Sequence, residues 1–299
     1  MIGISTRQLE VFVTVATTGS IKLAAQRLHV TQPAVSMGLA DLEKQLGTPL
    51  FDRLRGRLVL NARGHDVLPK AREIVERLRE LTDHTTTDPA LKGDLRIGAS
   101  NTIGNYRVGD LLGTFMQNHP GVALHVDVIN TKAIAERLLD HTLDIGAIEG
   151  PLNDSRLDVM AWREDRLLVC AAPRHPLAQR SSLSPGDFLD AHWILREPGS
   201  AMRVQTEQAL ARLARVNVVL ELGQVEAIKQ AVIAGLGLAC LPEAALHDAL
   251  QTGRLVVLPT PFLTLSRTLA IVVHKSRYRG ALVNAFLQSL ATGKAPLRL

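Results

Sequence analysis

The segment TQPAVSM, which begins at Thr31, carries polar side chains that are suited to reading the edges of DNA bases. A glutamine amide can pair with adenine through two hydrogen bonds, and a serine hydroxyl can bond to a base edge or to a phosphate. We therefore expect Gln32 and Ser36 to make direct base contacts, with Thr31 and Pro33 at the same helix start. Met37, an apolar side chain in the same turn, could touch a thymine methyl group.

Three arginines follow shortly afterwards, in RLRGRLVL, and indicate a phosphate-binding arm. Their alternation with leucines predicts a short β-hairpin, or wing, whose guanidinium groups face DNA phosphates or a minor groove. Arg53 and Arg55 are the candidate phosphate contacts, and Arg57 continues the pattern. The alternative is an ordinary exposed hairpin that contacts no nucleic acid.

Two amphipathic helices separated by a tight break would position these side chains. Their apolar faces are formed by Ala24, Ala25 and Leu28 and by Val35, Leu39, Leu42 and Leu46. Thr31 stands where a helix N-cap is expected, Pro33 falls in the first turn, and Gly47 is a typical residue just after a helix end. This pattern predicts a helix-turn-helix whose second helix can enter a DNA major groove. The alternative is a helical hairpin that only packs a core.

The excess of positive charge near the N-terminus of the chain favours a nucleic-acid partner for that part. The net charge of +5 comes from 34 basic and 29 acidic residues, and the first 66 residues hold eight Lys or Arg against five Asp or Glu. The two cysteines, Cys170 and Cys240, lie far apart in apolar runs, so we expect buried free thiols. Neither they nor the ten scattered histidines have metal-ligand spacing, so we expect no metal and no cofactor.

Missing sequence signals lead to two expectations, one about where in the cell the protein acts and one about whether it is an enzyme. The N-terminus shows no charged and apolar regions of a secretory signal, and no apolar run reaches the ~18 residues of a membrane span. We therefore expect a soluble, cytoplasmic protein. Common catalytic motifs, including GxSxG, a P-loop and a Ser/His/Asp arrangement, are also missing, so we do not expect an enzyme.

A long helix is expected after the arm. Its apolar positions step by four and three residues, at Val67, Ala71, Ile74, Leu78 and Leu81. Such a heptad seam needs a partner helix, either in a second copy of the chain or in this chain's own head. Asn61 is the expected N-cap, and Pro69 could kink the helix. The threonines, Asp88-Pro89 and Gly93 of LTDHTTTDPALKG predict a hinge there.

From about residue 92 the pattern changes to short apolar runs that alternate with helical stretches such as Val108–Asn118 and Glu226–Ala234. The runs are LRIGAS, LHVDVI, LDIGAIEG, RLLVCAAP, HWILRE, VVLELG, LGLACLP, RLVVLP and TLAIVVH. Alternation of this kind predicts parallel α/β sheets. The order of the runs indicates two lobes, with the chain returning to the first lobe at its end.

A two-lobed α/β body binds its ligand between the lobes, at strand ends and helix starts. Ser100, Asn101 and Thr102 follow the strand LRIGA, where free N–H groups and hydroxyls could hold an anion. In the second lobe, Ser200 and Gln224 stand before helices in the same way. Each of these residues could instead be a simple N-cap.

The order AAQRL, HV, TQPAVS, LADLEKQLG and PLFDR resembles the DNA-binding head of the LysR-type transcriptional regulators, although many relatives carry a basic residue in place of Met37. The stretches DIGAIEGP, GLGLACLPE and RTLAIVVHKSR resemble the body of the same family, so the resemblance covers essentially the whole chain. It implies a mainly α winged helix-turn-helix, a linker helix that pairs in an antiparallel dimer, and an α/β effector domain of two lobes with a periplasmic-binding-protein-like fold.

Within that family, ASNTIGNY, IEGP, WILREPGS and EAIKQAVIAGLG are most similar to the YeiE-type branch, and more loosely to regulators of sulfur assimilation and carbon fixation. Relatives in sulfur assimilation respond to small sulfur-containing anions, so the resemblance implies a small oxyanion or carboxylate as effector. Glu149 and Met202 join the candidate effector-binding residues. Relatives often read GSGTR where this chain has GSAMR, and Met202 would make the pocket more apolar. Arg196 and Arg203 could supply charge, or could pair with acids such as Glu197.

We therefore expect three parts: a winged helix-turn-helix DNA-binding domain (1–60), a linker helix with a hinge (61–91), and an effector-binding domain (92–299) with lobe I at about 92–161 and 267–299 and lobe II at about 162–266. The expected function is ligand-responsive regulation of transcription. Its partners would be double-stranded promoter DNA, a small anionic effector, further copies of the chain in a homodimer or homotetramer, and RNA polymerase. The alternative is a cytosolic small-solute-binding module whose N-terminal head serves another partner.

Overall fold

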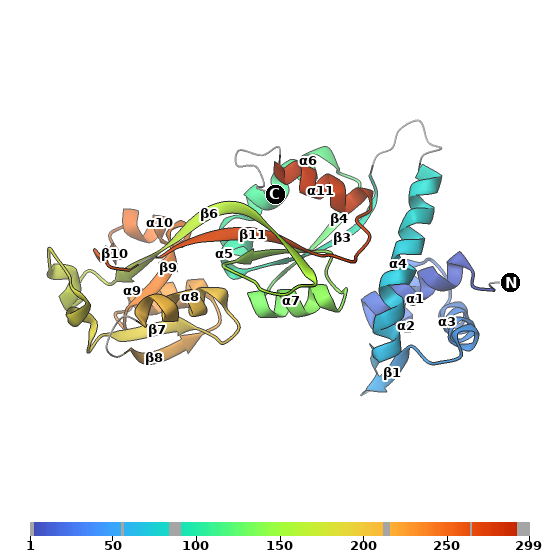
Figure 1. The fold of residues 1–299 in the computed structure, drawn as a ribbon, viewed down its shortest axis with the longest axis horizontal. Coiled ribbons are helices and arrows are strands. Elements are labelled where there is room, and N and C mark those ends of the chain that lie inside the picture. Colours follow the sequence, from blue (N-terminus) through green and yellow to red (C-terminus); the bar gives the residue numbers. More distant parts are fainter. Residues whose placement is uncertain (1–2, 55–56, 84–90, 212–215, 264, 292–299) are drawn as a thin grey trace.

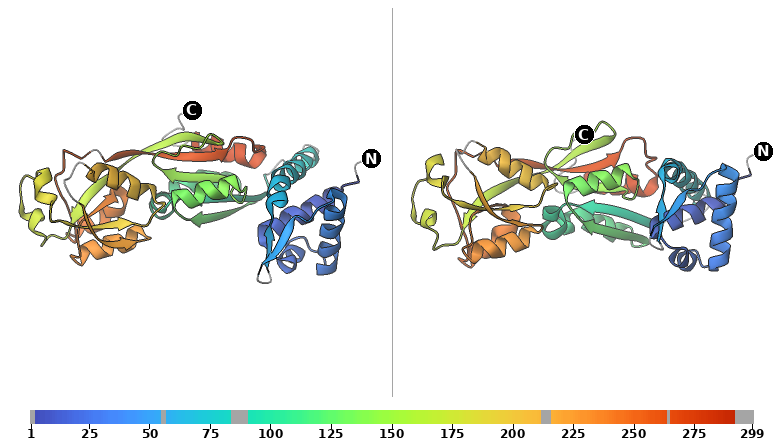
Figure 2. Two further views of the ribbon diagram at one scale, coloured as in Figure 1. Left: turned by 60° about the horizontal axis from the view of Figure 1, so that its bottom comes forward. Right: turned by 90° about the horizontal axis from the view of Figure 1, so that it is seen from below.

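A computed structural model describes residues 3–54, 57–83, 91–211, 216–263 and 265–291. A helical head lies at one end of the molecule, lobe I of the body lies in the middle, and lobe II lies at the other end (Figure 1). The long helix α4 stands between the head and the body, and two further views show the same order of parts (Figure 2). This arrangement is the expected one, in which a winged helix-turn-helix and a long helix precede a two-lobed α/β body.

The described residues of the head form α1 (Thr6–Thr18), α2 (Ile21–Arg27), α3 (Gln32–Leu46), β1 (Phe51–Leu54) and β2 (Arg57–Leu60). Ser5, Ser20 and Thr31 cap the three helices, because each side chain accepts a hydrogen bond from a first-turn backbone N–H. Gly47 ends α3 with a left-handed φ of 70°, as predicted. The apolar faces of the helices meet in one core around Phe12, whose side chain is fully buried.

The helix α4 (Ala62–Asp83) begins at the predicted cap. The side-chain oxygen of Asn61 accepts a hydrogen bond from the backbone N–H of Gly64 at 2.9 Å. Pro69 lies inside the helix. The hinge predicted over LTDHTTTDPALKG falls mostly on residues 84–90, which lie outside the described part of the chain.

The predicted seam of α4 divides between two surroundings. Ala71 is buried in the head core, so this end of the seam packs on the chain's own head. Ile74, Leu78 and Leu81 are 46%, 36% and 68% exposed, so the other end presents an uncovered apolar stripe. Packing on the chain's own head is therefore confirmed for the first half of the helix, whereas pairing with a second copy stays a prediction for the exposed half.

The described elements of lobe I are β3 (Gly93–Ala99), α5 (Asn101–Tyr106), α6 (Val108–Asn118), β4 (Val122–Val128), α7 (Thr131–Leu139), β5 (Ile145–Glu149) and α11 (Ala281–Ala291). The strand β3 pairs in parallel with β4 on one side and β5 on the other. The helices α6 and α11 lie on one face of this sheet and α7 lies on the other (Figure 1). Two buried clusters, one on each face, hold the layers together.

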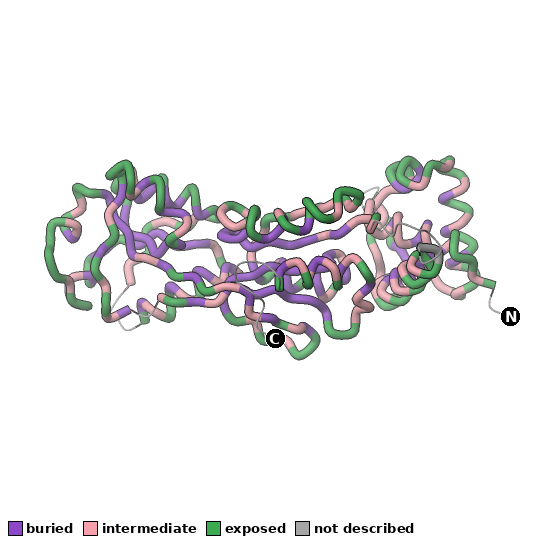
Figure 3. The backbone as a smooth tube through the Cα atoms, turned by 90° about the horizontal axis from the view of Figure 1, so that it is seen from above, coloured by how far each residue is buried: buried purple, intermediate pink, exposed green. Residues whose placement is uncertain are grey.

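The described elements of lobe II are two short 3₁₀ turns (Pro176–Gln179 and Pro185–Phe188), β7 (His192–Arg196), α8 (Ala201–Leu210), β8 (Asn217–Leu222), α9 (Val225–Ile233), β9 (Ala239–Pro242), α10 (Glu243–Gln251) and β10 (Val256–Val257). Their core surrounds Trp193, which is fully buried. Cys170 and Cys240 are buried free thiols in this core, as predicted. Figure 3 shows that buried residues follow the strands along the body, while the helices expose one side.

Two long strands, β6 (Leu157–Ala171) and β11 (Ser266–His274), run through the middle of the molecule and join the lobes (Figure 1). The strand β11 is antiparallel to both β5 and β6, and β6 is antiparallel to β9 and β10. The expectation of parallel sheets is therefore wrong for these strands, because the chain returns from lobe II in the opposite direction. The sequence analysis also found only the second half of β6, which begins at Leu157.

No helix within the described ranges is both long enough and apolar enough to cross a lipid bilayer.

Gly64 provides a test of the packing between α4 and the wing. A Cβ atom at this position would overlap the backbone carbonyl of Leu50 and the side chain of Leu60. We expect Gly64→Ala to lower the free energy of unfolding by about 1–3 kcal/mol, because the backbone cannot move aside without disturbing the head core.

Gly109→Ala is the matched control, since nothing lies within 4 Å of the added Cβ in α6. Alanine there should stabilise the helix by up to about 1 kcal/mol. Thermal and denaturant unfolding would measure both changes, and a loss of similar size in the two variants would show that Gly64 has no special packing role.

Candidate functional site

The amino-terminal turn of α3 presents polar side chains to solvent. The predicted contacts on this turn are all exposed, namely Thr31, Gln32, Pro33, Ser36 and Met37. The Thr31 hydroxyl accepts a hydrogen bond from the backbone N–H of Ala34 at 3.4 Å, which satisfies one free donor at the helix start. The opposite face of α3 is buried in the head core, so the helix is held from behind while this turn stays open.

The wing predicted from the arginines is present. The strands β1 and β2 pair in an antiparallel manner, with Arg53 opposite Leu58 and Leu54 opposite Arg57. Consecutive side chains on a strand point to opposite faces, so Arg53 and Arg57 leave the hairpin on alternate faces. Both are exposed, whereas Arg55 lies outside the described residues.

A third cation lies beside the wing. Lys22, in α2, lines a surface hollow together with Arg53 and Arg57. The sequence analysis did not single out Lys22, because a lone lysine on a helix carries no local signal. Although Arg53 and Arg57 start from alternate faces of the hairpin, all three cationic side chains therefore border the same hollow.

The lobe I candidates meet at the carboxyl ends of two neighbouring parallel strands. Ser100, Asn101 and Thr102 follow β3, Glu149 ends β5, and all four residues are buried. The carboxylate Oε1 of Glu149 accepts a hydrogen bond from the backbone N–H of Thr102 at 2.9 Å. The Ser100 hydroxyl lies near the same carboxylate, but it makes no hydrogen bond of ordinary geometry among the described residues.

The charged centre of this cluster is Arg267, at the start of β11, which the sequence analysis missed. Its guanidinium donates to Glu149 at 2.6 Å, to Asp165 of β6 at 2.7 Å, and to the Thr102 hydroxyl at 3.1 Å. The three charged side chains are at most 3% exposed. The one signal available in the sequence is an arginine that opens the otherwise apolar strand RTLAIVVH.

This network sets the charge of Glu149. Burial alone raises the pKa of a carboxyl group, but the Arg267 charge and the hydrogen bonds from Thr102 outweigh burial and hold the pKa of Glu149 below its usual range. Two carboxylates share one guanidinium, so the described part of the cluster keeps one excess negative charge.

Polar groups of the two lobes meet next to this cluster. The Asn101 side chain donates to Gln224 and accepts from the backbone N–H of Val225 at 3.0 Å, so it bonds to the start of α9 in lobe II. On the other side, the Asn130 amide donates to Glu197 at 3.2 Å. The structure therefore brings together four of the predicted residues of lobe I and Gln224 of lobe II.

The other lobe II candidates have structural roles. The Ser200 hydroxyl caps α8, accepting from the backbone N–H of Arg203 at 3.4 Å. Met202 does not widen a pocket as expected, because α8 turns it into the hydrophobic core of lobe II. Arg196 and Arg203 pair with acids, the former with Glu197 at 2.7 Å, which was one of the two alternatives.

Arg267 offers a test of the buried network. Arg267→Gln leaves Glu149 and Asp165 without their cation, and we expect the free energy of unfolding to fall by about 3–5 kcal/mol at neutral pH. The control is Arg166→Gln, which breaks an exposed pair with Glu243 and should leave the free energy of unfolding nearly unchanged, because solvent screens the pair.

The pH dependence of this difference has a defined sign. A carboxyl group whose pKa is lowered by folding stabilises the protein above its unfolded pKa, here 4.5, and loses that effect as the pH falls through the folded value. The gap between wild type and Arg267→Gln should therefore narrow in acid. Equal losses in both variants, or a gap that widens in acid, would contradict this account.

Comparisons with known proteins fit both halves of the structure. The family model "Bacterial regulatory helix-turn-helix protein, lysR family" matches residues 6–65, and the model "LysR substrate binding domain" matches residues 89–295. The HTH-type transcriptional regulator YeiE of Escherichia coli is 37% identical over 294 residues, which cover 98% of this chain and 99% of YeiE.

Solved structures agree with the fold. Full-length OxyR from Pseudomonas aeruginosa superposes with a TM-score of 0.77 at 24% identity, over 98% of this chain and 97% of OxyR. The CcmR regulatory domain of Synechocystis, solved in complex with 2-PG, has a TM-score of 0.62 at 28% identity and covers 68% of this chain and 98% of that domain. The chain belongs to the LysR family, whose members are DNA-binding transcriptional regulators with an effector-binding domain and not enzymes.

Proposed function

We propose that this regulator binds promoter DNA through α3 and the wing, and that a small anionic metabolite between the lobes controls it. The observation that carries the second part is Asn101. It ties lobe I to the start of α9 beside the buried Ser100 hydroxyl, which lies near the Glu149 carboxylate but makes no hydrogen bond of ordinary geometry among the described residues. A ligand that bonds to Ser100 at this junction would change how the lobes are held together.

The DNA contacts follow from exposure and chemistry. Gln32 and Ser36 stand on the open turn of α3, where they suit direct base readout. Met37 is 62% exposed on the same turn and suits contact with a thymine methyl. Arg53 and Arg57, with Lys22, supply phosphate contacts, which position the head without reading sequence.

The charge at the proposed effector site limits which classes of ligand can bind there. The excess negative charge shared by Glu149 and Asp165 disfavours a bare anion at that point. A ligand that carries a hydrogen-bond donor as well as its anionic group could donate to Glu149 while its anion faces the hydroxyls and backbone N–H groups. We therefore favour hydroxy acids and protonated oxyanions over fully ionised inorganic anions. The structure of CcmR with 2-PG, in a related domain, supports a small metabolite as ligand.

The proposal assigns one role to each part of the chain: DNA binding to residues 1–60, connection to residues 61–91, and effector binding to residues 92–299, where lobe I (92–161 and 267–299) and lobe II (162–266) would close on the ligand. The exposed stripe of Ile74, Leu78 and Leu81 fits a second copy of α4, which supports a homodimer and, through it, a homotetramer. Ligand binding would then alter the spacing of the heads on DNA, provided that the ligand binds the two states with different affinity. A regulator of this kind acts in the cytoplasm, with RNA polymerase as a further partner.

Binding to the promoter region beside the protein's own gene tests the DNA half. We expect Gln32→Ala to lose about 1–3 kcal/mol of discrimination between the operator and competitor DNA, because an adenine contact is lost. Arg53→Ala should weaken binding to all sequences and reduce the slope of log affinity against log salt by about one. Fluorescence anisotropy across a salt series measures both effects.

Arg166→Ala, remote from the head in lobe II, is the control and should bind DNA like the wild type. Salt-independent binding, or equal effects of all three substitutions, would refute the proposed DNA contacts.

Ligand binding tests the effector half. Titration calorimetry with glycolate, acetate, thiosulfate, sulfate and 2-PG should rank glycolate above acetate, because only glycolate has a hydroxyl that can donate to Glu149. Ser100→Ala should weaken the tightest of these ligands about tenfold with little loss of stability, because the hydroxyl makes no hydrogen bond of ordinary geometry among the described residues. The exposed Ser182→Ala in lobe II is the matched control. Equal affinities in wild type and Ser100→Ala would place the effector elsewhere.

A further inference from the structure

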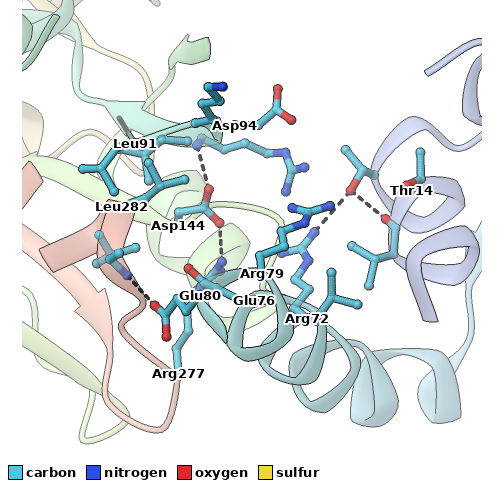
Figure 4. A pocket seen from close by; sticks show the side chains of 18 of the residues that line it. Thr14, Arg72, Glu76, Arg79, Glu80, Leu91, Asp94, Asp144, Arg277 and Leu282 are labelled. Atoms are coloured by element: carbon cyan, nitrogen blue, oxygen red, sulfur yellow. Dashed lines mark hydrogen bonds and ion pairs between the residues drawn. The ribbon is translucent and has the colours of Figure 1, made fainter. Parts of the chain in front are cut away.

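A cavity lies where the head meets lobe I, and its lining shares no residue with the proposed effector site. Its volume is about 300 Å³, and its walls come from α1, α4, β3 and the start of α11. Figure 4 shows Arg72, Glu76, Arg79 and Glu80 of α4 on one side of it and Asp144 with Leu282 of lobe I on the other. The proposed DNA and effector sites use none of these groups.

The lining of this cavity is strongly charged, and its cationic side chains outnumber its acidic ones. It includes six cationic side chains and four acidic ones, and the cations are Arg27, Arg72, Arg79, Lys92, Arg96 and Arg277. Two of the acids are held by specific partners, since Asp94 pairs with Arg27 and Asp144 pairs with Arg277 at 2.5 Å. Arg79 pairs with Glu10, so the question is what balances the charges of Arg72 and Arg96.

Arg72 is the first of these. It is 9% exposed, and it donates to the backbone carbonyl of His141 and, at 3.5 Å, to the Thr17 hydroxyl. Both acceptors are neutral, and its Nε has no hydrogen-bond partner among the described residues. Burial, followed by the nearby charges of Arg277 and Arg96, lowers the pKa of Arg72 to about 9. An anion would relieve this burial cost.

Arg96 is the second. Its backbone N–H donates to Asp144 at 2.7 Å, but its guanidinium has no hydrogen bond or ion pair within the described ranges. Burial lowers its pKa, while the Asp144 charge acts in the opposite direction. Arg96 projects from β3 of lobe I and Arg72 from α4, so the two underpaired guanidiniums come from opposite walls of the cavity.

The acids that remain in the cavity do not compensate them. Glu80 is engaged by the Tyr278 hydroxyl at 2.6 Å and by the backbone N–H of Ala281 at 2.8 Å. Burial raises the pKa of Glu76 to about 7, so this group is only partly ionised at neutral pH. Leu91 and Leu282 add an apolar side to the cavity.

We propose that this cavity is a second ligand site, which takes a small dianion carrying phosphate or carboxylate groups, bound between Arg72 of α4 and Arg96 of β3. A dianion matches the two guanidiniums, which are the donors best suited to planar or tetrahedral oxyanions. Because one arginine belongs to the linker helix and the other to lobe I, an occupied site holds the head against the body. This inference does not depend on the effector proposed for the cleft.

The test compares Arg96→Gln with the wild-type full-length protein, using inorganic phosphate and malonate as probes against chloride of equal ionic strength. Without probe, Arg96→Gln should be at least as heat-stable as the wild type, because it removes a half-buried charge that makes no hydrogen bond or ion pair among the described residues. Low millimolar phosphate or malonate should raise the melting temperature of the wild type. In Arg96→Gln the apparent affinity should fall about tenfold or more.

Hydrogen exchange read by mass spectrometry locates the bound probe. We expect protection in the backbone segments 72–80 and 91–97 of the wild type, retained in Ser100→Ala and in the surface control Arg166→Gln but lost in Arg96→Gln. Phosphate protecting and malonate failing to protect would assign the site to phosphate-bearing ligands, and the reverse would assign it to dicarboxylates. Protection confined to segments 100–104 and 224–228, or no difference between wild type and Arg96→Gln, would overturn the proposal without touching the cleft site.

Discussion

One buried guanidinium connects the parts of the body on which ligand control depends. Arg267 of β11 bonds to Glu149 at the end of β5, to Asp165 in the middle of β6 and to Thr102 at the start of α5. A charge that is removed from water must be matched closely, because an unpaired one costs several kcal/mol. The network therefore fixes how the strands that cross between the lobes lie against the strand ends that carry the cleft. A ligand bound at the proposed effector site would therefore act on strands whose relative positions this network holds fixed.

The rest of the body follows from this arrangement. Each lobe has its own buried cluster of apolar side chains, so the lobes can move as units about the strands β6 and β11 that join them. Asn101 and Asn130 supply polar contacts between the lobes, and such contacts exchange with water at lower cost than an apolar interface. A ligand at the same junction competes with these bonds or adds to them. A small molecule that binds more tightly to one arrangement of the two lobes can therefore shift the equilibrium between the arrangements.

The head is attached to the body by charge more than by apolar packing. Arg27 pairs with Asp94, Arg72 reaches the carbonyl of His141, and Glu80 receives hydrogen bonds from the turn before α11. Dissolved salt screens ionic contacts of this kind, so the attachment of the head depends on ionic strength.

Local spacing in the sequence was sufficient to predict several of the helices and their ends. The N-caps Thr31 and Asn61, the C-terminal Gly47 and the helix Val108–Asn118 all stand where the pattern of polar and apolar residues places them, because helix periodicity and capping involve residues a few positions apart. The exposed turn of α3 and the polar residues that follow β3 were also located in this way, and their roles stay predictions. The family resemblance added the order of the parts.

Only the tertiary structure decided which distant groups share a site. Arg267 lies 102 residues from Asp165 and 118 from Glu149, so no local pattern pairs them. Similarly, the first half of β6 has four apolar residues, 159–162, next to charged ones, and we recognised it as a strand only where it pairs with β11. The sequence predicted Met202 as a pocket residue, but α8 places it in the core of lobe II. The apolar seam of α4 is continuous in the sequence, but the head buries only one half of it. The physical reason is the same in each case: sequence spacing sets which way a side chain leaves its own element, but packing of separate elements sets what it meets.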